Sequence, residues 1–320
     1  MKESAGRFAL GVLVVLLALV VAALSIMAIM HTRQPVPDAG ETPGYSPRFE
    51  VVEELDEEES EQEETEEQPA PEPPSYEVVP TSRVLTAFGG GQVMRALTGP
   101  CPMAETVVQT SYDNGVNWIS QDIGLLIPVT SPSRLVDTRD GMAVVLGQNP
   151  SDCGQQVAGI QAFGGELWDL SDVAGIWRVD VTDPTTISGP GGVVGHPGCE
   201  VVRLSANADG RVAALCEDAT LKVSTDSAAT WASVGDPIVG ADAVEVGTDG
   251  LFVATVDQAT CAGAQVTRYD ASLAAVSGTC VPATGATAGA TALSQASDGQ
   301  LWLWAGDALL RSADQGATWE

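Results

Sequence analysis

The distribution of apolar and polar residues divides this 320-residue chain into three regions. Residues 8–30 form an apolar run of about 23 residues, which as a helix would be about 35 Å long and would cross a hydrocarbon core of about 30 Å. Residues 31–74 are rich in Pro and Glu. Beyond them, short apolar runs alternate with turn residues and show little helical periodicity, which predicts an all-β domain over residues 75–320.

The apolar run predicts an uncleaved transmembrane helix. A cleaved signal peptide, the alternative, has a shorter apolar core and a small-x-small cleavage site, and the end of this run offers no good one. Lys2, Arg7 and the terminal amine precede the run, and His31 and Arg33 follow it. The positive-inside rule then places residues 1–7 in the cytoplasm and the rest of the chain outside. We therefore predict a single-pass protein of the cell membrane with an extracytoplasmic C-terminal domain.

Residues 31–74 predict a disordered acidic linker. Its core, residues 53–67 (EELDEEESEQEETEE), has almost no apolar residues and cannot bury enough surface to fold. Like charges and prolines extend such a segment, so we expect a stalk that holds the following domain away from the membrane. The alternative is a site for cations or for a basic partner.

Three octets of similar sequence indicate a repeat protein. Ser111–Trp118 has the pattern S-x-D-x-G-x-x-W, which recurs at Ser312–Trp319 and, with Ala228 in place of Gly, at Ser224–Trp231. The second and third octets in chain order follow the same series: a strand, an Asp-Gly turn, a strand, a short loop and a strand. Asp-Gly between apolar runs is a strong hairpin signal, and Gly89-Gly90-Gly91 takes its place in the first unit. The four Asp-Gly turns are Asp140-Gly141, Asp209-Gly210, Asp249-Gly250 and Asp298-Gly299.

Five such units have the size and strand content of propeller blades. The predicted fold is therefore an all-β propeller of five blades, with six as the alternative. The octets resemble the Asp-box of BNR-repeat β-propellers, a family that includes sialidases, sortilin-type receptor ectodomains and photosystem II assembly-factor-like propellers. The resemblance covers roughly residues 80–320.

The resemblance implies that each octet is a structural turn between the third and fourth strands of a blade. The Ser and Asp oxygens would accept bonds from backbone amides, Gly would supply a positive φ, and Trp would bury apolar area. Ala228 predicts a turn that is strained or differently shaped. The residues assigned this structural role are Ser111, Asp113, Gly115, Trp118, Ser224, Asp226, Trp231, Ser312, Asp314, Gly316 and Trp319.

The last octet is followed only by Glu320, so the last blade would need a fourth strand from elsewhere. The segment 76–79 (Tyr-Glu-Val-Val), just after the prolines of the linker, has the alternation of a strand. We expect it to fill that position and close the ring.

Six cysteines, all beyond the apolar run, are consistent with three disulfides in an oxidising compartment. Fifteen connectivities are possible. Two pairs flank predicted hairpin turns nearly symmetrically, and the remaining two cysteines follow the second strand of successive units. This placement favours the pairs Cys199–Cys216, Cys261–Cys280 and Cys101–Cys153, the last joining adjacent blades.

The net charge of −29 argues against some partners. The stalk accounts for only part of it, and Lys222 is the only lysine of the predicted domain. Binding of nucleic acid, or of an anionic membrane by this domain, needs clustered Lys and Arg, so neither is expected.

No catalytic constellation is visible. Sialidases on this scaffold use an arginine triad, a Tyr–Glu nucleophile pair and an Asp, but their Arg-Ile-Pro-type motif is missing, and Arg95 in Val-Met-Arg-Ala is its nearest match. Patterns for serine hydrolases, zinc proteases and phosphate-binding loops are also missing. We assign no catalytic residue, metal or cofactor. The domain's arginines are Arg83, Arg95, Arg134, Arg139, Arg178, Arg203, Arg211, Arg268 and Arg311.

Tryptophans outside the octets have two predicted roles. Trp302 and Trp304 alternate with leucines, which predicts a strand buried between two blades. Trp168 and Trp177 lie in the long second unit and are candidates for an exposed binding surface. His196 follows in a loop with residues 189–192 (Gly-Pro-Gly-Gly), which we interpret as a blade-to-blade connection. His196 is a third candidate for the binding surface.

The leading functional hypothesis is a binding or scaffold module that recognises a protein or a glycan through the loops of one propeller face. The alternative is a glycosidase-like hydrolase.

Overall fold

The computed structural model describes residues 78–138, 141–165 and 167–320. Within these residues, no helix has the length and apolar character needed to cross a membrane. The predicted transmembrane helix, residues 8–30, and the predicted linker, residues 31–74, lie outside the described residues, so both remain predictions.

The described residues form six antiparallel sheets, which we call blades one to six in chain order. Blade one contains β1 (Arg83–Gly89), β2 (Gln92–Leu97), β3 (Val107–Ser111) and β4 (Ile119–Asp122). Blade two contains β5 (Thr130–Asp137), β6 (Met142–Asn149), β7 (Asp152–Ala162) and β8 (Asp169–Ser171). Blade three contains β9 (Arg178–Val179), β10 (Ile187–Gly189) and β11 (Val193–Gly195).

The second half of the ring follows the same plan. Blade four contains β12 (Val201–Ala206), β13 (Val212–Cys216), β14 (Leu221–Ser224) and β15 (Ala232–Ser233). Blade five contains β16 (Ala241–Val246), β17 (Leu251–Thr255), β18 (Gly263–Tyr269) and β19 (Ala275–Pro282). Blade six contains β20 (Thr291–Gln295), β21 (Leu301–Ala305) and β22 (Ala308–Ser312). Three short 3-10 helices, η1 (Ile123–Leu125), η2 (Val173–Gly175) and η3 (Pro190–Gly192), lie in the connections.

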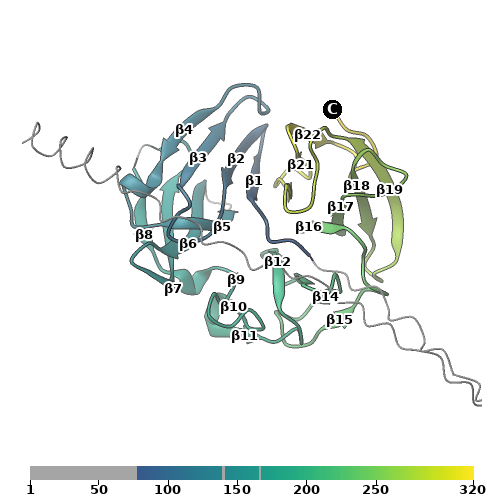
Figure 1. Ribbon diagram of the computed structural model, residues 1–320, viewed down its shortest axis with the longest axis horizontal. Helices are drawn as coiled ribbons and strands as arrows, with labels where there is room; N and C mark the ends of the chain where they lie inside the picture. The colour runs from purple at the N-terminus through teal and green to yellow at the C-terminus, as the bar shows by residue number, and fades with distance from the viewer. Residues whose placement is uncertain (1–77, 139–140, 166) are drawn as a thin grey trace, which may run out of the picture. The chain divides into compact units, whose positions relative to one another are not determined.

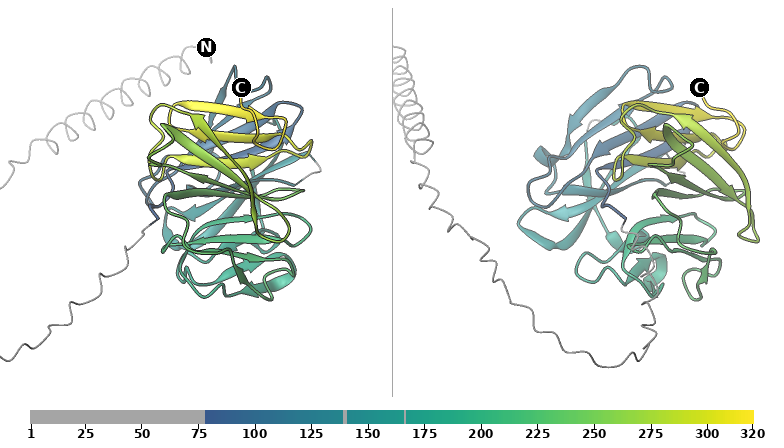
Figure 2. Two further views of the ribbon diagram at one scale, coloured as in Figure 1. Left: turned by 90° about the vertical axis from the view of Figure 1, so that its right-hand side faces the viewer. Right: turned by 45° about the vertical axis from the view of Figure 1, so that its right-hand side comes forward.

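The blades are arranged around a central axis, which makes the domain a six-bladed β-propeller (Figure 1). The first strand of each blade lies nearest the axis, and β1 of blade one lies beside β20 of blade six as well as β5 of blade two. Two further views show the blades side by side within the domain (Figure 2). Each sheet therefore has two neighbours against which its faces are buried.

The predicted count of five blades was wrong, and the alternative of six is correct. Sequence repeats missed blade three because its strands have only two or three residues and none is followed by an Asp-Gly turn or an octet. Instead, Asp180 and Asp183 bind the backbone amides of Thr182 and Thr185 and form the turn between β9 and β10. Residues 189–192, predicted to connect two blades, join β10 to β11 within blade three.

The first octet is a turn between β3 and β4 that its own side chains hold together. The Ser111 hydroxyl donates to Asp113 Oδ1 at 2.9 Å and accepts the Gly115 amide at 2.9 Å. Asp113 Oδ1 also accepts the Asn117 amide at 2.8 Å, and the Trp118 indole N–H donates to Gly115 O at 2.9 Å. In this octet the Ser, Asp, Gly and Trp residues thus bind within the turn itself.

The other two octets repeat the Ser and Asp bonds, including the octet in which Ala228 replaces Gly. Ala228 has a φ of 64°, in the same left-handed region as Gly115 at 79° and Gly316 at 88°. The turn thus keeps its shape and places an L-residue in an unfavourable conformation. The indole N–H of Trp231 is buried without a hydrogen-bond partner, unlike those of Trp118 and Trp319.

The interface between blades one and six closes the ring. Trp302 and Trp304 of β21 pack with Leu85, Ala87 and Val93 of blade one in one buried cluster. Only 1% of the Trp302 surface is exposed. Both tryptophans are therefore core residues, as their alternation with leucines predicted.

Two arginines stack on tryptophan rings at this interface. The Arg95 guanidinium lies 3.8 Å from the ring centroid of Trp118 and 4.8 Å from that of Trp304, and Arg83 stacks on Trp304 at 4.5 Å. Burial and then the charge of Arg83 lower the pKa of Arg95. Cation–π contacts thus join strands of the first and last blades.

The segment predicted to close the ring as a fourth strand of the last blade lies elsewhere. Of residues 76–79, the structure describes Val78 and Val79. The Val78 amide donates to Glu217 O of blade four at 2.8 Å, and Val79 O accepts a bond from Arg203 at 2.7 Å. Val78 is buried among residues of blades four and five. The prediction was wrong because closure comes from packing of β1 and β2 against β20 and β21.

We expect Gly316→Ala to lower the free energy of unfolding by about 1 kcal/mol. An added Cβ would meet its nearest neighbours only at 3.7 Å, so the cost is that of the left-handed backbone at φ 88°. Urea unfolding measures it. Gly175→Ala is the matched control, because its Cβ would meet nothing within 4 Å and its φ is not in that region. Equal effects of the two changes would contradict this account.

Trp302→Ala should lower the free energy of unfolding by about 3–5 kcal/mol, because a fully buried indole between the first and last blades is lost. Val116→Ala, at a side chain 75% exposed, should change it little. The two variants are compared by thermal and urea unfolding. A Trp302→Ala protein as stable as Val116→Ala would show that the blade-one and blade-six interface does not hold the ring closed.

Candidate functional site

The two faces of the propeller are built differently. In every blade except the third, the connections from first to second strand and from third to fourth strand lie on one face, which carries the octets and the Asp-Gly turns. We call it the octet face. In these five blades the remaining connections lie on the opposite face, and they include the longer ones, residues 98–106, 256–262 and 283–290.

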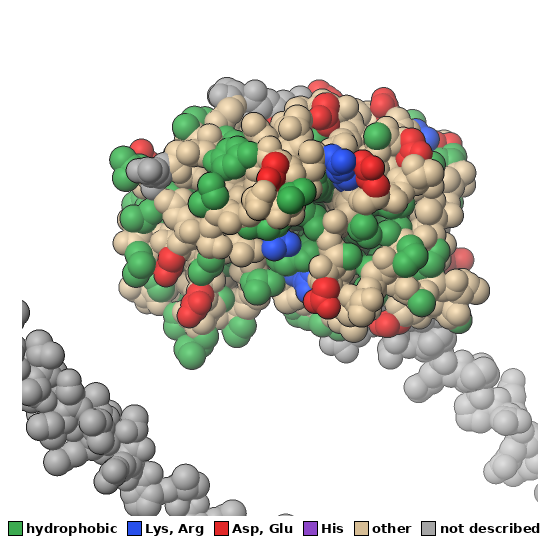
Figure 3. Space-filling view, turned by 90° about the horizontal axis from the view of Figure 1, so that it is seen from above, with side chains coloured by type: hydrophobic (Ala, Val, Ile, Leu, Met, Phe, Trp, Pro, Cys, Tyr) green, Lys and Arg blue, Asp and Glu red, His purple; other side chains and the backbone are tan. Residues whose placement is uncertain are grey.

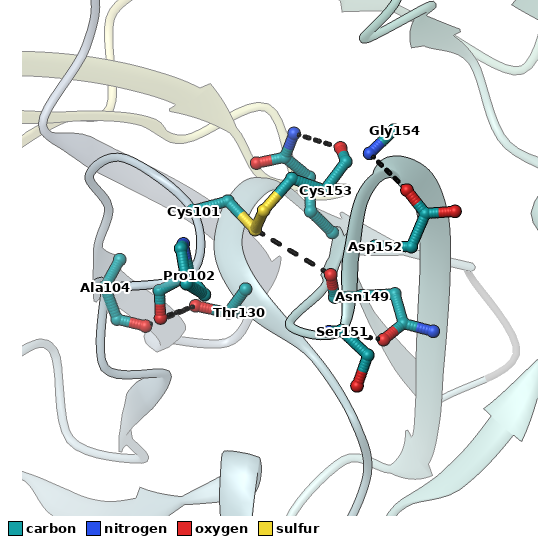
Figure 4. Close-up of a disulfide and its surroundings, with 10 residues drawn as sticks. Cys101, Pro102, Ala104, Thr130, Asn149, Ser151, Asp152, Cys153 and Gly154 are labelled. Carbon is teal, nitrogen blue, oxygen red and sulfur yellow. Dashed lines mark hydrogen bonds between the residues drawn. A yellow bond between two sulfur atoms is a disulfide. The ribbon is translucent and has the colours of Figure 1, made fainter.

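All six cysteines lie on this opposite face, which we call the disulfide face. The disulfides Cys101–Cys153, Cys199–Cys216 and Cys261–Cys280 have Cα–Cα distances of 5.9, 5.8 and 5.5 Å. They are the pairs that hairpin placement favoured. The first joins blade one to blade two, and its surroundings include Asn149 O, which lies 3.7 Å from Cys101 Sγ (Figure 4).

A cavity of about 1230 Å³ occupies the axis of the ring. Its wall combines apolar side chains from the inner strands with charged residues of both signs. The charged residues are Arg83, Arg134, Arg178, Arg203, Asp137, Asp180, Asp209 and Glu245.

The arginines of the channel donate to main-chain carbonyls. Arg134 Nη1 donates to Trp177 O at 2.6 Å, Arg178 Nη1 donates to Val173 O at 2.7 Å, and Arg83 donates to Gly306 O. These bonds fix connections between blades and use donors that a carboxylate-binding triad would need. The arginines therefore act mainly as structural ties.

Arg203 and Asp242 form a buried ion pair, with 3.2 Å between Arg203 Nη2 and Asp242 Oδ1. Asp242 Oδ1 also accepts the Gly289 amide at 2.7 Å, and Arg203 Nε donates to Asp242 O at 2.7 Å. Burial raises the pKa of the Asp242 carboxyl, although the Arg203 charge opposes that shift. With its bond to Val79, Arg203 links blade four, blade five and the segment that leads into β1.

A belt of equivalent side chains links the inner strands. Ser205, Glu245 and Ser294 each lie four residues before the Asp of an Asp-Gly turn. Each accepts a main-chain amide of the next blade: Ser205 from Val246 at 2.9 Å, Glu245 from Gln295 at 2.9 Å, and Ser294 from Ala87 at 3.0 Å. The same position thus makes the same inter-blade bond across blades four, five, six and one.

Glu245 is the ionisable member of this belt. Its Oε2 accepts the Ser205 hydroxyl at 2.8 Å, while Oε1 accepts the Gln295 amide. Burial raises the pKa of Glu245 to about 7, against the opposing effects of these two hydrogen bonds and the Arg134 charge. A carboxyl that titrates near neutral pH could exchange a proton with a ligand in the channel.

The predicted binding surface of Trp168, Trp177 and His196 does not form. Trp168 is 5% exposed in the core between blades one and two, where its indole N–H donates to Gln121 at 2.9 Å. Trp177 is 9% exposed and packs between blades three and four. His196 is exposed, and its Nδ1 lies 3.3 Å from the Thr186 hydroxyl. Blades one and two bury the Trp168 indole, and blade three, absent from the predicted repeats, supplies neighbours that cover Trp177.

Glu245 was not singled out from the sequence, because one glutamate among many acidic residues carries no motif. Its spacing before the Asp-Gly turn, shared with Ser205 and Ser294, is the signal that could have found it. Across residues 78–138, 141–165 and 167–320, no three His, Cys, Asp or Glu side chains form a group that could hold a metal ion.

The sequence matches no protein-family model and no curated protein. Similar solved structures include GH43B of the Bacteroides ovatus xyloglucan PUL, at 12% identity and a TM-score of 0.39, over 72% of this chain and 49% of that one. YCF48 bound to D1 peptide is similar at 13% identity and a TM-score of 0.29, over 79% and 71%.

An Aleuria aurantia lectin variant in complex with α-methyl-L-fucoside is similar at 10% identity and a TM-score of 0.49, over 77% of this chain and 96% of the lectin. This chain spans about half the length of the GH43B protein. Likenesses this distant assign no function to the chain.

Glu245→Gln should flatten the dependence of stability on pH between about 5 and 8. Because the pKa of Glu245 is raised from 4.5 to about 7 on folding, its protonated form favours the folded state, and this contribution is lost as pH rises through 7. The Asp226 and Asp314 carboxyls, which hydrogen bonds from Thr230 and Thr318 hold at a pKa of about 2, titrate below this range. Melting temperatures of both proteins across the range provide the measurement, and identical pH slopes would contradict this role.

Proposed function

We propose that this chain is an extracytoplasmic Asp-box propeller, held at the membrane by residues 8–30, that acts as a binding or scaffold module through its disulfide face. The observation that carries the proposal is the position of all three disulfides on that face. Crosslinked loops lose little conformational entropy on binding, so they offer a preorganised surface.

The octets support membership of the Asp-box type of propeller. Their Ser and Asp side chains bind the backbone of the same turn in all three copies, and two of the three have Gly at the position of positive φ. Because these residues are used within the turn, a ligand is expected elsewhere. Three disulfides also support an oxidising, extracytoplasmic location.

A protein is the partner we favour over a glycan. Sugar rings commonly bind to the faces of exposed aromatic side chains, and the candidates for such a platform, Trp168 and Trp177, are buried. A protein partner needs exposed apolar side chains on a rigid surface, which the loops of the disulfide face supply.

A glycosidase-like hydrolase is the second candidate, and Glu245 is the observation that favours it. A carboxyl with a pKa of about 7 beside a cavity that Asp137, Asp180 and Asp209 also line is suited to general acid catalysis. Release of sugar from a panel of oligosaccharides by the natural chain, abolished by Glu245→Gln, would favour this candidate.

Photo-crosslinking in native membranes tests the proposed binding face. We expect partner adducts when p-benzoylphenylalanine replaces exposed Glu105, Asp218 or Ala259 on the disulfide face, and none when it replaces exposed Ala229 or Ala317 on the octet face. Adducts only at the octet positions would contradict the proposal. If no adduct forms and sugar is released, the hydrolase becomes the favoured function.

A further inference from the structure

The two most exposed large apolar side chains among the described residues lie on one part of the disulfide face. Met103, in the connection from β2 to β3, is 81% exposed, and Leu125, in the connection from β4 to β5, is 82% exposed. Leu126 and two exposed prolines of the same two connections, Pro102 and Pro128, lie within three residues of them in the chain. We call this set the blade-one patch: Pro102, Met103, Leu125, Leu126 and Pro128.

Hydrogen bonds join the two connections that carry the patch. The Ile123 amide donates to Thr106 O at 3.0 Å, and the Thr106 hydroxyl donates to Val129 O at 2.8 Å. The Thr130 hydroxyl donates to Ala104 O and lies 3.4 Å from Pro102 O (Figure 4). The side chains of the patch therefore emerge from adjoining, mutually bonded backbone segments.

Covalent and apolar anchors restrain the same segments. Cys101, next to Pro102, is bonded to Cys153 of blade two. Ile123 and Ile127, which flank the two exposed leucines, are buried in the core between blades one and two. Met103 and Leu125 are thus exposed on a restrained surface, which is the condition under which exposed apolar side chains serve as binding anchors.

The charged residues that border the blade-one patch within its two connecting segments are acidic. Glu105 and Asp122 are exposed beside it, and the connecting segments 98–106 and 123–129 contain no Lys, Arg or His. Seen from above, the left part of the rim carries scattered hydrophobic and acidic side chains among uncharged polar ones, and the visible Lys and Arg lie near the middle and on the right (Figure 3). An acidic border attracts a partner with basic residues and repels an acidic one.

We propose that the blade-one patch is the docking site for a partner protein that presents apolar side chains flanked by Lys or Arg. This inference rests on the proposed function and names the chemistry of its partner. A second copy of this chain fits less well, because two acidic borders would face each other. An anionic lipid surface is disfavoured by the same charges.

Labelled peptides test this chemistry on the full-length chain. The probes are Lys-Leu-Trp-Leu-Lys and its charge-inverted counterpart Glu-Leu-Trp-Leu-Glu, and fluorescence anisotropy at low and high salt gives their affinities. We expect saturable binding of the basic peptide and none of the acidic one. The double variant Met103→Ser, Leu125→Ser should weaken binding about tenfold or more, because it removes both apolar anchors. These two exposed side chains contribute little to folding, so the variant should still fold.

Two further variants separate charge from apolar contact. Glu105→Gln combined with Asp122→Asn should weaken binding severalfold and reduce its salt dependence. Val116→Ser, a matched control at an exposed apolar residue of the octet face, should bind the basic peptide like the natural chain.

Four results would overturn the inference. Basic-peptide binding that the double variant leaves unchanged would place the peptide elsewhere, such as on the acidic residues 53–67. Equal binding of both peptides would remove the charge argument. Self-association lost in the double variant would make a second copy the occupant, and binding to phosphatidylcholine vesicles lost in that variant would make it a lipid surface.

Crosslinking distinguishes failure of this inference from failure of the proposed function. If adducts at Asp218 or Ala259 persist unchanged in the double variant, the disulfide face binds a partner without the blade-one patch, and only the inference fails. Adducts confined to Ala229 and Ala317 would contradict both.

Discussion

Closure of the ring between blades one and six is the constraint on which the rest of the structure depends. A propeller blade buries both faces against its neighbours, so an open ring would expose the facing sides of two blades. Trp302 and Trp304 fill this interface, where Arg83 and Arg95 stack on Trp304 and Arg95 also stacks on Trp118. With the first and last inner strands side by side, all six blades surround one channel. The position of each inner-strand residue is then fixed relative to its neighbours in the adjacent blades.

Closure of the ring allows hydrogen bonds between the inner strands of neighbouring blades. Ser294 reaches the Ala87 amide across the closing interface, as Ser205 reaches Val246 and Glu245 reaches Gln295 between other blades. A serine suffices at two of these positions, while Glu245 places a carboxyl at the third. That carboxyl is the strongest chemical feature of the channel, and its raised pKa results from burial within the closed ring.

Local interactions explain which features the sequence could predict. Each octet forms hydrogen bonds within eight residues, so its geometry follows from Ser, Asp, Gly and Trp at fixed spacing. The disulfides were predictable because hairpin folding brings Cys199 to Cys216 and Cys261 to Cys280. Blade three was missed because its strands are very short and side chains of Asp180 and Asp183 form its turn. Burial of Trp168 and Trp177, and the path of Val78, depend on contacts with distant segments that no local pattern encodes.

Native-state hydrogen exchange of the full-length chain tests most directly whether closure governs the whole domain. Because each blade is stable only between two neighbours, amides in β1, β2, β20 and β21 should exchange through the same global opening as the central strands of the other blades. The free energies of opening should then agree across the ring and fall together with added denaturant. Exchange of β20 and β21 at a clearly lower free energy than β13 and β17 would contradict the account, because it would show blade six opening while the other blades remain folded.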